Sequence, residues 1–127
     1  MEKTAVVRQL WNDIHTQNWG RLEDYFCSDA VIEWNNTNEQ FTVHEFIAAN
    51  SLYPGNWSVA VERLEACGDL IVSVVKVTLR DADASFHAAS FFKFRYGKIG
   101  LLNEYWGEDG PPPQWRTERG IGRPIHV

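Results

Sequence analysis

Glu104 is the residue of this sequence whose type and surroundings best suit acid–base chemistry. It lies in an apolar stretch, 99–106, directly before Tyr105 and Trp106. A carboxyl group beside an indole in a closed pocket loses hydration, which raises its pKa and lets it act as a general acid or base near neutral pH. A structural role also fits, in which salt bridges or hydrogen bonds hold the carboxylate.

The face of the strand on which Glu104 lies decides between these roles. By simple alternation, Glu104 shares a face with Leu102 and Trp106. The opposite face carries Ile99, Leu101, Asn103 and Tyr105. Hydrophobicity alone would turn this second set inward and leave Glu104 in solvent or at a contact between subunits.

Asn50 is a second candidate, because it lies on an apolar helix face. Val43, Phe46, Ile47 and Asn50 follow the i, i+3, i+4, i+7 spacing of one side of a helix. A buried amide that lacks hydrogen-bond partners destabilises the protein. We expect its partner to be a ligand or, as a structural alternative, the backbone of the turn at 53–55.

The stretch 85–96 alternates like a long strand. One face is apolar apart from a single hydroxyl, and consists of Phe86, Ala88, Ser90, Phe92 and Phe94. The other face consists of His87, Ala89, Phe91, Lys93 and Arg95. We expect Ser90 to face the interior, where it could orient a ligand, and His87 to point outward on the sheet or at a dimer contact. The sequence places no histidine beside Ser90, so a serine nucleophile is not expected.

Aromatic residues are abundant, with six tryptophans, four tyrosines and seven phenylalanines. Aromatic walls with a few polar groups are typical of small-molecule sites. Together with Asn50 and Ser90, the residues that we predict to bind a ligand are Trp34, Tyr53, Trp57, Phe92 and Trp106. Each of them would serve equally in a plain hydrophobic core.

Helices are expected at the start of the chain. Val6, Leu10 and Ile14 recur at helical spacing and predict a helix over 2–17. Asn18 is a good capping residue for a second, short helix that follows.

The rest of the chain is predicted as one strand, one helix and four further strands. A turn at 28–29 leads into a strand over 30–35. Thr42 and Glu45 have the spacing of a capping box, so a helix begins after Thr42 and ends before Pro54. The four strands cover 57–67, 70–79, 85–96 and 99–106. Helices followed by an antiparallel meander indicate an α+β fold.

Bulk properties exclude several classes of protein. At 127 residues, with no linker, the chain forms one domain over 1–127. The net charge is −5 and no basic run occurs, so we expect no nucleic-acid partner. No stretch is apolar enough to cross a membrane and the start has no signal-peptide layout, so we expect a cytoplasmic protein.

Motifs for metals and cofactors are missing from the sequence. It has no HExxH, no paired Cys or His spacing, no P-loop and no GxGxxG. Cys27 and Cys67 are isolated, and we expect free thiols. We therefore predict no metal and no cofactor.

The order of elements resembles the nuclear transport factor 2-like superfamily, and SnoaL-like proteins in particular. The segments that carry the resemblance are AVVRQLW, NWGRLEDYFCSDAVIEW, EFIAANSL and FFKFRYGKIGLLNEYWG. The resemblance implies a cone-shaped, strongly bent, mostly antiparallel sheet wrapped around a long N-terminal helix, with a pocket at its wide end. It also implies that Leu102, Glu104 and Trp106 face the pocket, and that homodimers form through the outer face of the sheet.

The catalytic groups of the ketosteroid isomerases, which share this fold, are not matched. Where that family has an oxyanion-binding tyrosine, a general-base aspartate and a protonated aspartate, this chain has Leu10, Trp34 and Ser90. That isomerase chemistry is therefore not expected.

The sequence thus predicts a SnoaL-like protein that binds a small, largely apolar molecule. Glu104 would be the acid or base of a cofactor-free isomerisation, cyclisation, dehydration or hydrolysis. The alternative is a non-catalytic binding or dimerisation module. The proline-containing tail, 108–127, would be a lid or a contact with a partner subunit.

Overall fold

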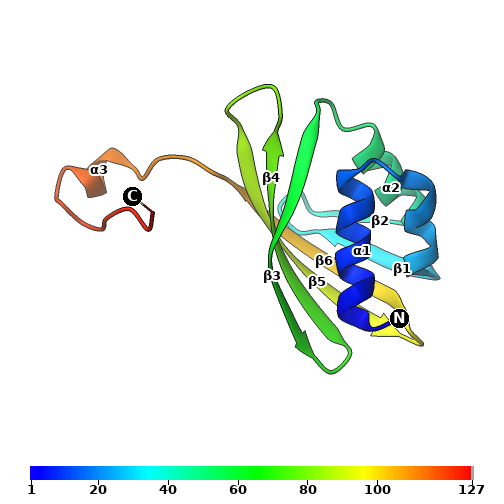
Figure 1. The fold of residues 1–127 in the computed structure, drawn as a ribbon. Coiled ribbons are helices and arrows are strands. Elements are labelled where there is room, and N and C mark those ends of the chain that lie inside the picture. The colour runs from blue at the N-terminus through cyan, green and yellow to red at the C-terminus, as the bar shows by residue number, and fades with distance from the viewer. Residues whose placement is uncertain (127) are drawn as a thin grey trace.

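The structure, a computed structural model, describes residues 1–126 and has an α+β architecture (Figure 1). The elements of its first half are α1 (Lys3–His15), the 3-10 helix η1 (Trp19–Tyr25), β1 (Phe26–Trp34), β2 (Glu39–Phe41) and α2 (Val43–Ser51). Those of its second half are β3 (Trp57–Cys67), β4 (Leu70–Leu79), β5 (Ser85–Arg95), β6 (Lys98–Glu108) and α3 (Gln114–Thr117). The predicted fold class is confirmed.

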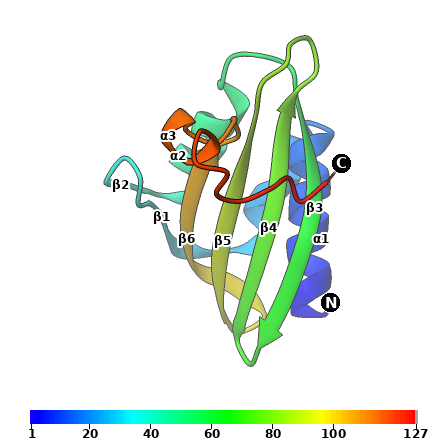
Figure 2. The same cartoon turned by 90° about the vertical axis from the view of Figure 1, so that its left-hand side faces the viewer.

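One curved, open sheet of six strands forms the body of the protein, with the order β2-β1-β6-β5-β4-β3. Neighbouring strands are antiparallel except β1 and β6, which run parallel. Strand β6 therefore lies between β1 and β5, in the interior of the sheet. Helices α1 and α2 lie on one side of the sheet, which Figure 2 shows from its other side.

Helix α1 forms as the apolar spacing predicts, and Val6, Leu10 and Ile14 are buried under it. The second helix differs from the prediction: it is a 3-10 helix, and the Asn18 side chain makes no capping bond. Gln17, at φ 60°, turns the chain between the two helices.

Strand β1 begins earlier than predicted. The expected turn at 28–29 is wrong, because these residues continue the strand. The pairing of β1 with β6 shifts register between Phe26 and Val31, and this irregularity takes up the bend that we had assigned to a turn. Beyond it the strand alternates, and Ala30 and Ile32 are buried.

Helix α2 begins where its capping box predicts. The Glu45 amide donates to Thr42 Oγ1 at 3.2 Å, and the Thr42 amide donates to Glu45 Oε1 at 2.9 Å. The short strand β2 just before it was not predicted, because three residues are too few to show an alternating pattern.

A local irregularity in β6 reconciles the two conflicting predictions for its inward face. Lys93 pairs with Leu101 but Phe94 pairs with Ile99, so Gly100 is an extra residue in β6. Alternation restarts after it, and both Ile99 and Leu102 are fully buried. The inward face is therefore the one that carries Glu104.

The C-terminal tail leaves the sheet from the end of β6 and projects away from it, on the side opposite α1 and α2 (Figure 1). Within residues 110–126, the hydrogen bonds that the structure describes join tail residues to one another. Trp115 is 56% exposed and Ile125 is 91% exposed. The tail therefore does not form a lid over the helix side of the sheet.

No helix in the described part of the chain has the length and apolar character of a membrane span.

Asp13 is a buried carboxyl group that joins α1 to η1, and the sequence analysis did not single it out. It is 2% exposed and accepts hydrogen bonds from the Tyr25 hydroxyl and, at 3.1 Å, from Gln9 Nε2. These hydrogen bonds offset the free-energy cost of burying the Asp13 carboxyl group, because a buried polar group without partners destabilises the protein.

Replacing this carboxyl should destabilise the protein. Asp13→Ala leaves the Tyr25 hydroxyl without its acceptor, so we expect the free energy of unfolding in urea to fall by about 2–3 kcal/mol. Asp24→Ala, in the exposed part of η1, is the matched control, with an expected change of about 0.5 kcal/mol or less. Equal effects of both substitutions would contradict a structural role for Asp13.

Candidate functional site

A cavity of about 450 Å³ lies on the helix side of the sheet. The helical segments and the α2–β3 connection contribute Trp11, Ile14, Gln17, Trp19, Ala49, Asn50, Ser51, Tyr53 and Gly55. The sheet contributes Trp34, Trp57, Val59, Val77, Phe86, Ala88, Glu104, Trp106 and Glu108. Seven of these residues are aromatic, so the wall is largely apolar.

Glu104 reaches this cavity while only 5% exposed. The sheet register places one partner on each neighbouring strand: Trp34 pairs with Glu104 from β1, and Ser90 pairs with it from β5. Trp34 Nε1 donates to Glu104 Oε1 at 3.1 Å, and Ser90 Oγ donates to Glu104 Oε2 at 2.5 Å. Each carboxyl oxygen is thus held by a side chain from a different strand.

Burial raises the pKa of the Glu104 carboxyl above its ordinary value, because the ionised form loses its hydration. The hydrogen bonds from Ser90 and Trp34 act in the opposite direction, since both stabilise the anion. Desolvation is the largest effect, so the net shift is upward. A carboxyl group in this state suits both proton donation and proton abstraction close to neutral pH.

Aromatic rings pack against one another around the cavity. The Trp34 and Trp106 rings meet at 80° with centroids 5.3 Å apart, and the Tyr53 and Trp57 rings stack at 5.4 Å and 22°. Gly55 makes the second pair possible: its φ is +107°, and a Cβ there would lie 2.7 Å from Trp57 Nε1.

Six of the eight predicted site residues line the cavity: Trp34, Asn50, Tyr53, Trp57, Glu104 and Trp106. Ser90 and Phe92 do not. Ser90 is fully buried and bonds Glu104, so it reaches the cavity only through that carboxyl. Phe92 is fully buried in the core, edge-on to Trp11. Alternation identified their inward face but could not show how deep along the strand the cavity extends.

Asn50 lines the cavity and makes a local hydrogen bond. Its Nδ2 donates to the Phe46 carbonyl at 2.8 Å, one turn back in α2. The amide therefore does not bind the turn at 53–55 that we proposed as its structural partner.

The cavity residues that the N-terminal helical segments contribute were not predicted from the sequence. Trp11, Gln17 and Trp19 line the cavity, yet Trp11 has the spacing of a plain core residue. The turn at Gln17 supplies no apolar pattern at all. The sequence feature that could have identified this part of the lining is the aromatic side chain of Trp11 on α1, the helix that the bent sheet was expected to surround.

Within residues 1–126 no three His, Cys, Asp or Glu side chains are grouped as metal ligands. Glu104 is the buried carboxyl group among the residues that line the cavity.

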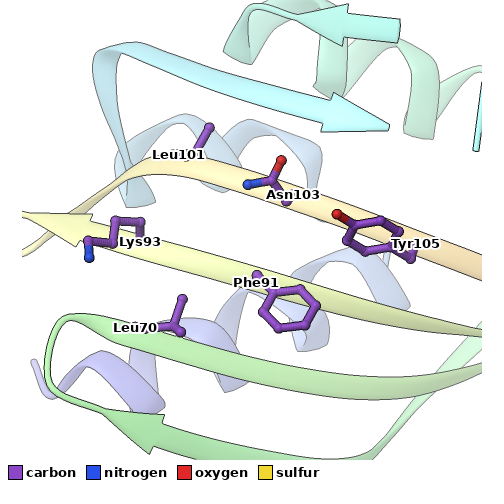
Figure 3. A pocket seen from close by; sticks show the side chains of 6 residues that line it. All are labelled: Leu70, Phe91, Lys93, Leu101, Asn103 and Tyr105. Carbon is purple, nitrogen blue, oxygen red and sulfur yellow. The ribbon is translucent and has the colours of Figure 1, made fainter. Parts of the chain in front are cut away.

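A shallow hollow lies on the opposite, outer face of the sheet (Figure 3). It is lined by Leu70, Phe91, Lys93, Leu101, Asn103 and Tyr105. The Phe91 and Tyr105 rings contact edge-to-face, with centroids 6.0 Å apart. Figure 3 shows these side chains standing on β4, β5 and β6.

His87 points outward from the same face, as predicted, and bridges two carboxylates. Its Nδ1 lies 2.5 Å from Asp109 Oδ1, and its Nε2 lies 3.1 Å from Glu62 Oε1. Ser85 Oγ donates to the other oxygen of Asp109 at 2.6 Å. The hydrogen bond from Ser85 and, after it, the one with His87 lower the pKa of Asp109.

The raised pKa of Glu104 makes stability depend on pH. Between the ordinary glutamate pKa and the raised folded value, the folded state binds more protons than the unfolded state, so the free energy of unfolding falls as pH rises. Below this pH window, the contribution of Glu104 to the free energy of unfolding is fully present.

Comparison of wild type with Glu104→Gln isolates this effect, because glutamine does not titrate. We expect the stability difference, wild type minus variant, to decline as pH rises through the folded pKa. Urea unfolding from pH 4 to 9 measures it, and exposed groups such as Asp109 cancel in the difference. A difference that grows with pH would contradict the raised pKa.

No protein-family model and no curated protein matches the chain by sequence. Many solved structures match it in fold.

Three solved structures illustrate this likeness. A protein proposed to be a ketosteroid isomerase, from Kribbella flavida, has a TM-score of 0.82 and 25% identity, over 97% of this chain and 90% of that one. An NTF2-like protein of unknown function from Burkholderia xenovorans has a TM-score of 0.77 and 19% identity, over 90% and 89%. An LEH-like epoxide hydrolase from M. tuberculosis has a TM-score of 0.68 and 14% identity, over 82% and 81%.

The three structures match this chain in fold over 82% to 97% of its length. The chain therefore has the fold of the nuclear transport factor 2-like superfamily, in agreement with the resemblance of its sequence.

Proposed function

We propose that this protein binds a small, largely apolar molecule in the cavity, and that Glu104 is the general acid or base of a cofactor-free reaction. The reaction would be an isomerisation, cyclisation, dehydration or hydrolysis. One observation carries the proposal: a single buried carboxyl group opens into an aromatic cavity while a hydrogen bond fixes each of its oxygens. No other acidic side chain that lines the cavity is buried.

The geometry supports proton transfer in both directions. In its protonated form Glu104 can donate to a leaving or carbonyl oxygen of the bound molecule, and in its ionised form it can abstract a proton. Ser90 and Trp34 orient the carboxyl group, and their hydrogen bonds stabilise the anion when it forms. The apolar walls keep water away, which strengthens the electrostatic interactions of the carboxyl group.

The ketosteroid isomerase mechanism is not proposed. The three positions at which that family has its catalytic groups hold Leu10, Trp34 and Ser90, and Leu10 is fully buried in the core. The epoxide hydrolase of the same fold shows that this architecture is compatible with other chemistry.

A general reporter of carboxylate base catalysis tests the proposal. In 5-nitrobenzisoxazole, loss of the C3 proton to a base breaks the N–O bond, and the electron pair leaves on oxygen as a coloured cyanonitrophenolate. We expect saturable turnover that rises with pH as Glu104 ionises, with a midpoint above the usual glutamate range. Glu104→Gln should lower kcat/KM by at least about 100-fold.

Glu33→Gln is the matched control, because Glu33 lies next to Trp34 on β1 but is not among the residues that line the cavity. It should change kcat/KM by about threefold or less. Turnover that survives in folded Glu104→Gln, or the absence of saturable turnover in wild type, would contradict acid–base chemistry by Glu104. Loss of folding in Glu104→Gln would instead favour a structural role.

That structural role belongs to the alternative function, a non-catalytic binding or dimerisation module. It is favoured by one observation, that Glu104 already ties β1 and β5 to β6 through its hydrogen bonds. In this alternative the protein still binds a ligand or a partner, but does not transform it.

We further propose that the protein is a homodimer formed through the outer face of the sheet. Phe91 lies near the middle of that face, with Lys93 on one side along β5 and His87, which contacts Glu62 and Asp109, on the other. A two-fold axis near Phe91 would bring the lysine of one subunit against the carboxylates of its partner.

The tail supports the same arrangement. It projects from the outer side of the sheet and exposes Trp115, Ile121 and Ile125. Exposed apolar side chains on a projecting segment suit a contact with a second copy of the chain.

Introducing a charge at the centre of this face should dissociate the dimer. We expect Phe91→Asp to raise the dimer dissociation constant by at least about 100-fold, because two carboxylates would then meet at the axis. Sedimentation velocity measures the change. Leu52→Asp, at an 80% exposed position beside α2, is the control and should leave the dimer intact. A wild-type protein that sediments as a monomer at high micromolar concentration would contradict the proposal.

A further inference from the structure

We propose that the molecule bound in the cavity is an organic cation, an alkylated ammonium compound. This inference rests on the proposed function only in that it takes the cavity to be a binding site; it holds whether or not Glu104 carries out chemistry. The composition and hydrogen bonding of the lining residues lead to it.

The charges around the cavity are all of one sign. Glu104 and Glu108 are both lining residues, whereas no Lys, Arg or His lines the cavity. An anionic ligand would therefore meet two acidic groups and no counter-charge. A cation would find a carboxyl group at the inner wall and another at the rim.

Several hydrogen-bond donors of the lining are already engaged within the protein. Trp11 Nε1 donates to Ser73 Oγ at 3.0 Å, Trp34 Nε1 donates to Glu104, and Trp57 Nε1 donates to the Pro54 carbonyl at 2.8 Å. Asn50 donates its amide to the Phe46 carbonyl and keeps its side-chain oxygen for other partners. Beside the donors of Gln17, Trp19, Tyr53 and Trp106, the cavity presents carboxyl and amide oxygens together with aromatic rings.

Aromatic rings attract cations through the negative charge of their faces, and tryptophan does so most strongly. The rings of Trp34 and Trp106 stand nearly perpendicular, at 80°, and both residues line the cavity beside Glu104. A cavity lined by several tryptophan rings beside a carboxylate is a chemical environment that suits an alkylated ammonium group. The methyl groups on the nitrogen would contact the apolar walls. The positive charge of the ammonium group would interact with both the aromatic rings and the carboxylate.

Binding of such a cation is coupled to the ionisation of Glu104. The groups that face this carboxyl from the packed elements are Trp34 on β1, Ser90 on β5 and Trp106 on β6, none of which titrates in the accessible range. Tyr53 and Glu108 are the other titratable groups of the lining. A quaternary ammonium ion has no proton to lose, so a rise of its affinity with pH reports on the protein alone.

Three water-soluble probes of nearly equal shape separate the possibilities. They are choline, its neutral carbon isostere 3,3-dimethylbutan-1-ol, and the anion 3,3-dimethylbutanoate. Isothermal titration calorimetry from pH 5 to 9 should show choline binding about five- to thirtyfold more tightly than the neutral isostere at high pH. Its affinity should rise with pH, and the anion should bind most weakly.

Variants assign the effect to the cavity. Glu104→Gln should abolish the pH dependence of choline binding, whereas Glu33→Gln should keep it. Trp106→Leu should weaken choline at least about fivefold more than it weakens the neutral isostere. Trp115→Leu removes a tryptophan from the tail and should change neither affinity.

The outcomes distinguish failure of the cationic ligand from failure of the proposed binding function. If the neutral isostere binds as well as choline, the cationic ligand is wrong while the cavity remains a binding site, so the proposed function survives. If the anion binds best, the charge argument is overturned. If none of the three probes binds to folded wild-type protein at millimolar concentration, both this inference and the proposed binding function fail.

Discussion

The structure depends on a single unfavourable placement, a carboxyl group buried in the middle of a sheet. Glu104 lies on β6, between the two strands that hold its oxygens, so its desolvation is offset only if β1 and β5 stand in the correct register. A shift of either strand by one residue would turn Trp34 or Ser90 to the other face and leave the carboxyl group without a donor. The same hydrogen bonds that offset this burial also fix the orientation of the carboxyl group in the cavity wall.

Short-range signals predicted most of the fold. The Thr42–Glu45 capping box located α2 because all of its atoms lie within one helical turn. The spacing of Val6, Leu10 and Ile14 located α1 for the same reason. These patterns are local, so one sequence is enough to find them.

The site itself depends on contacts that local patterns do not contain. The extra residue at Gly100 changes which side chains of β6 face inward. An isolated glycine within a strand is a local sign of a bulge, but it does not show which residues pair across the irregularity. The separation of Ser90 and Phe92 from the cavity depends on how deeply α1 fills the curve of the sheet. Both features arise from packing between segments that are distant in sequence, which is why alternation and resemblance identified the correct face but not the extent of the cavity.

The parallel pairing of β1 with β6 has a consequence for how the protein is made. Trp34 and Glu104 are 70 residues apart in the chain yet form one hydrogen bond, and β6 is the last strand to be synthesised. The β3–β4–β5 meander can form earlier from sequential hairpins, whereas the centre of the sheet must wait for β6 to leave the ribosome and insert beside β1. Until then Trp34 lacks its acceptor and the aromatic wall is incomplete. A nascent chain therefore has no complete cavity until β6 is in place.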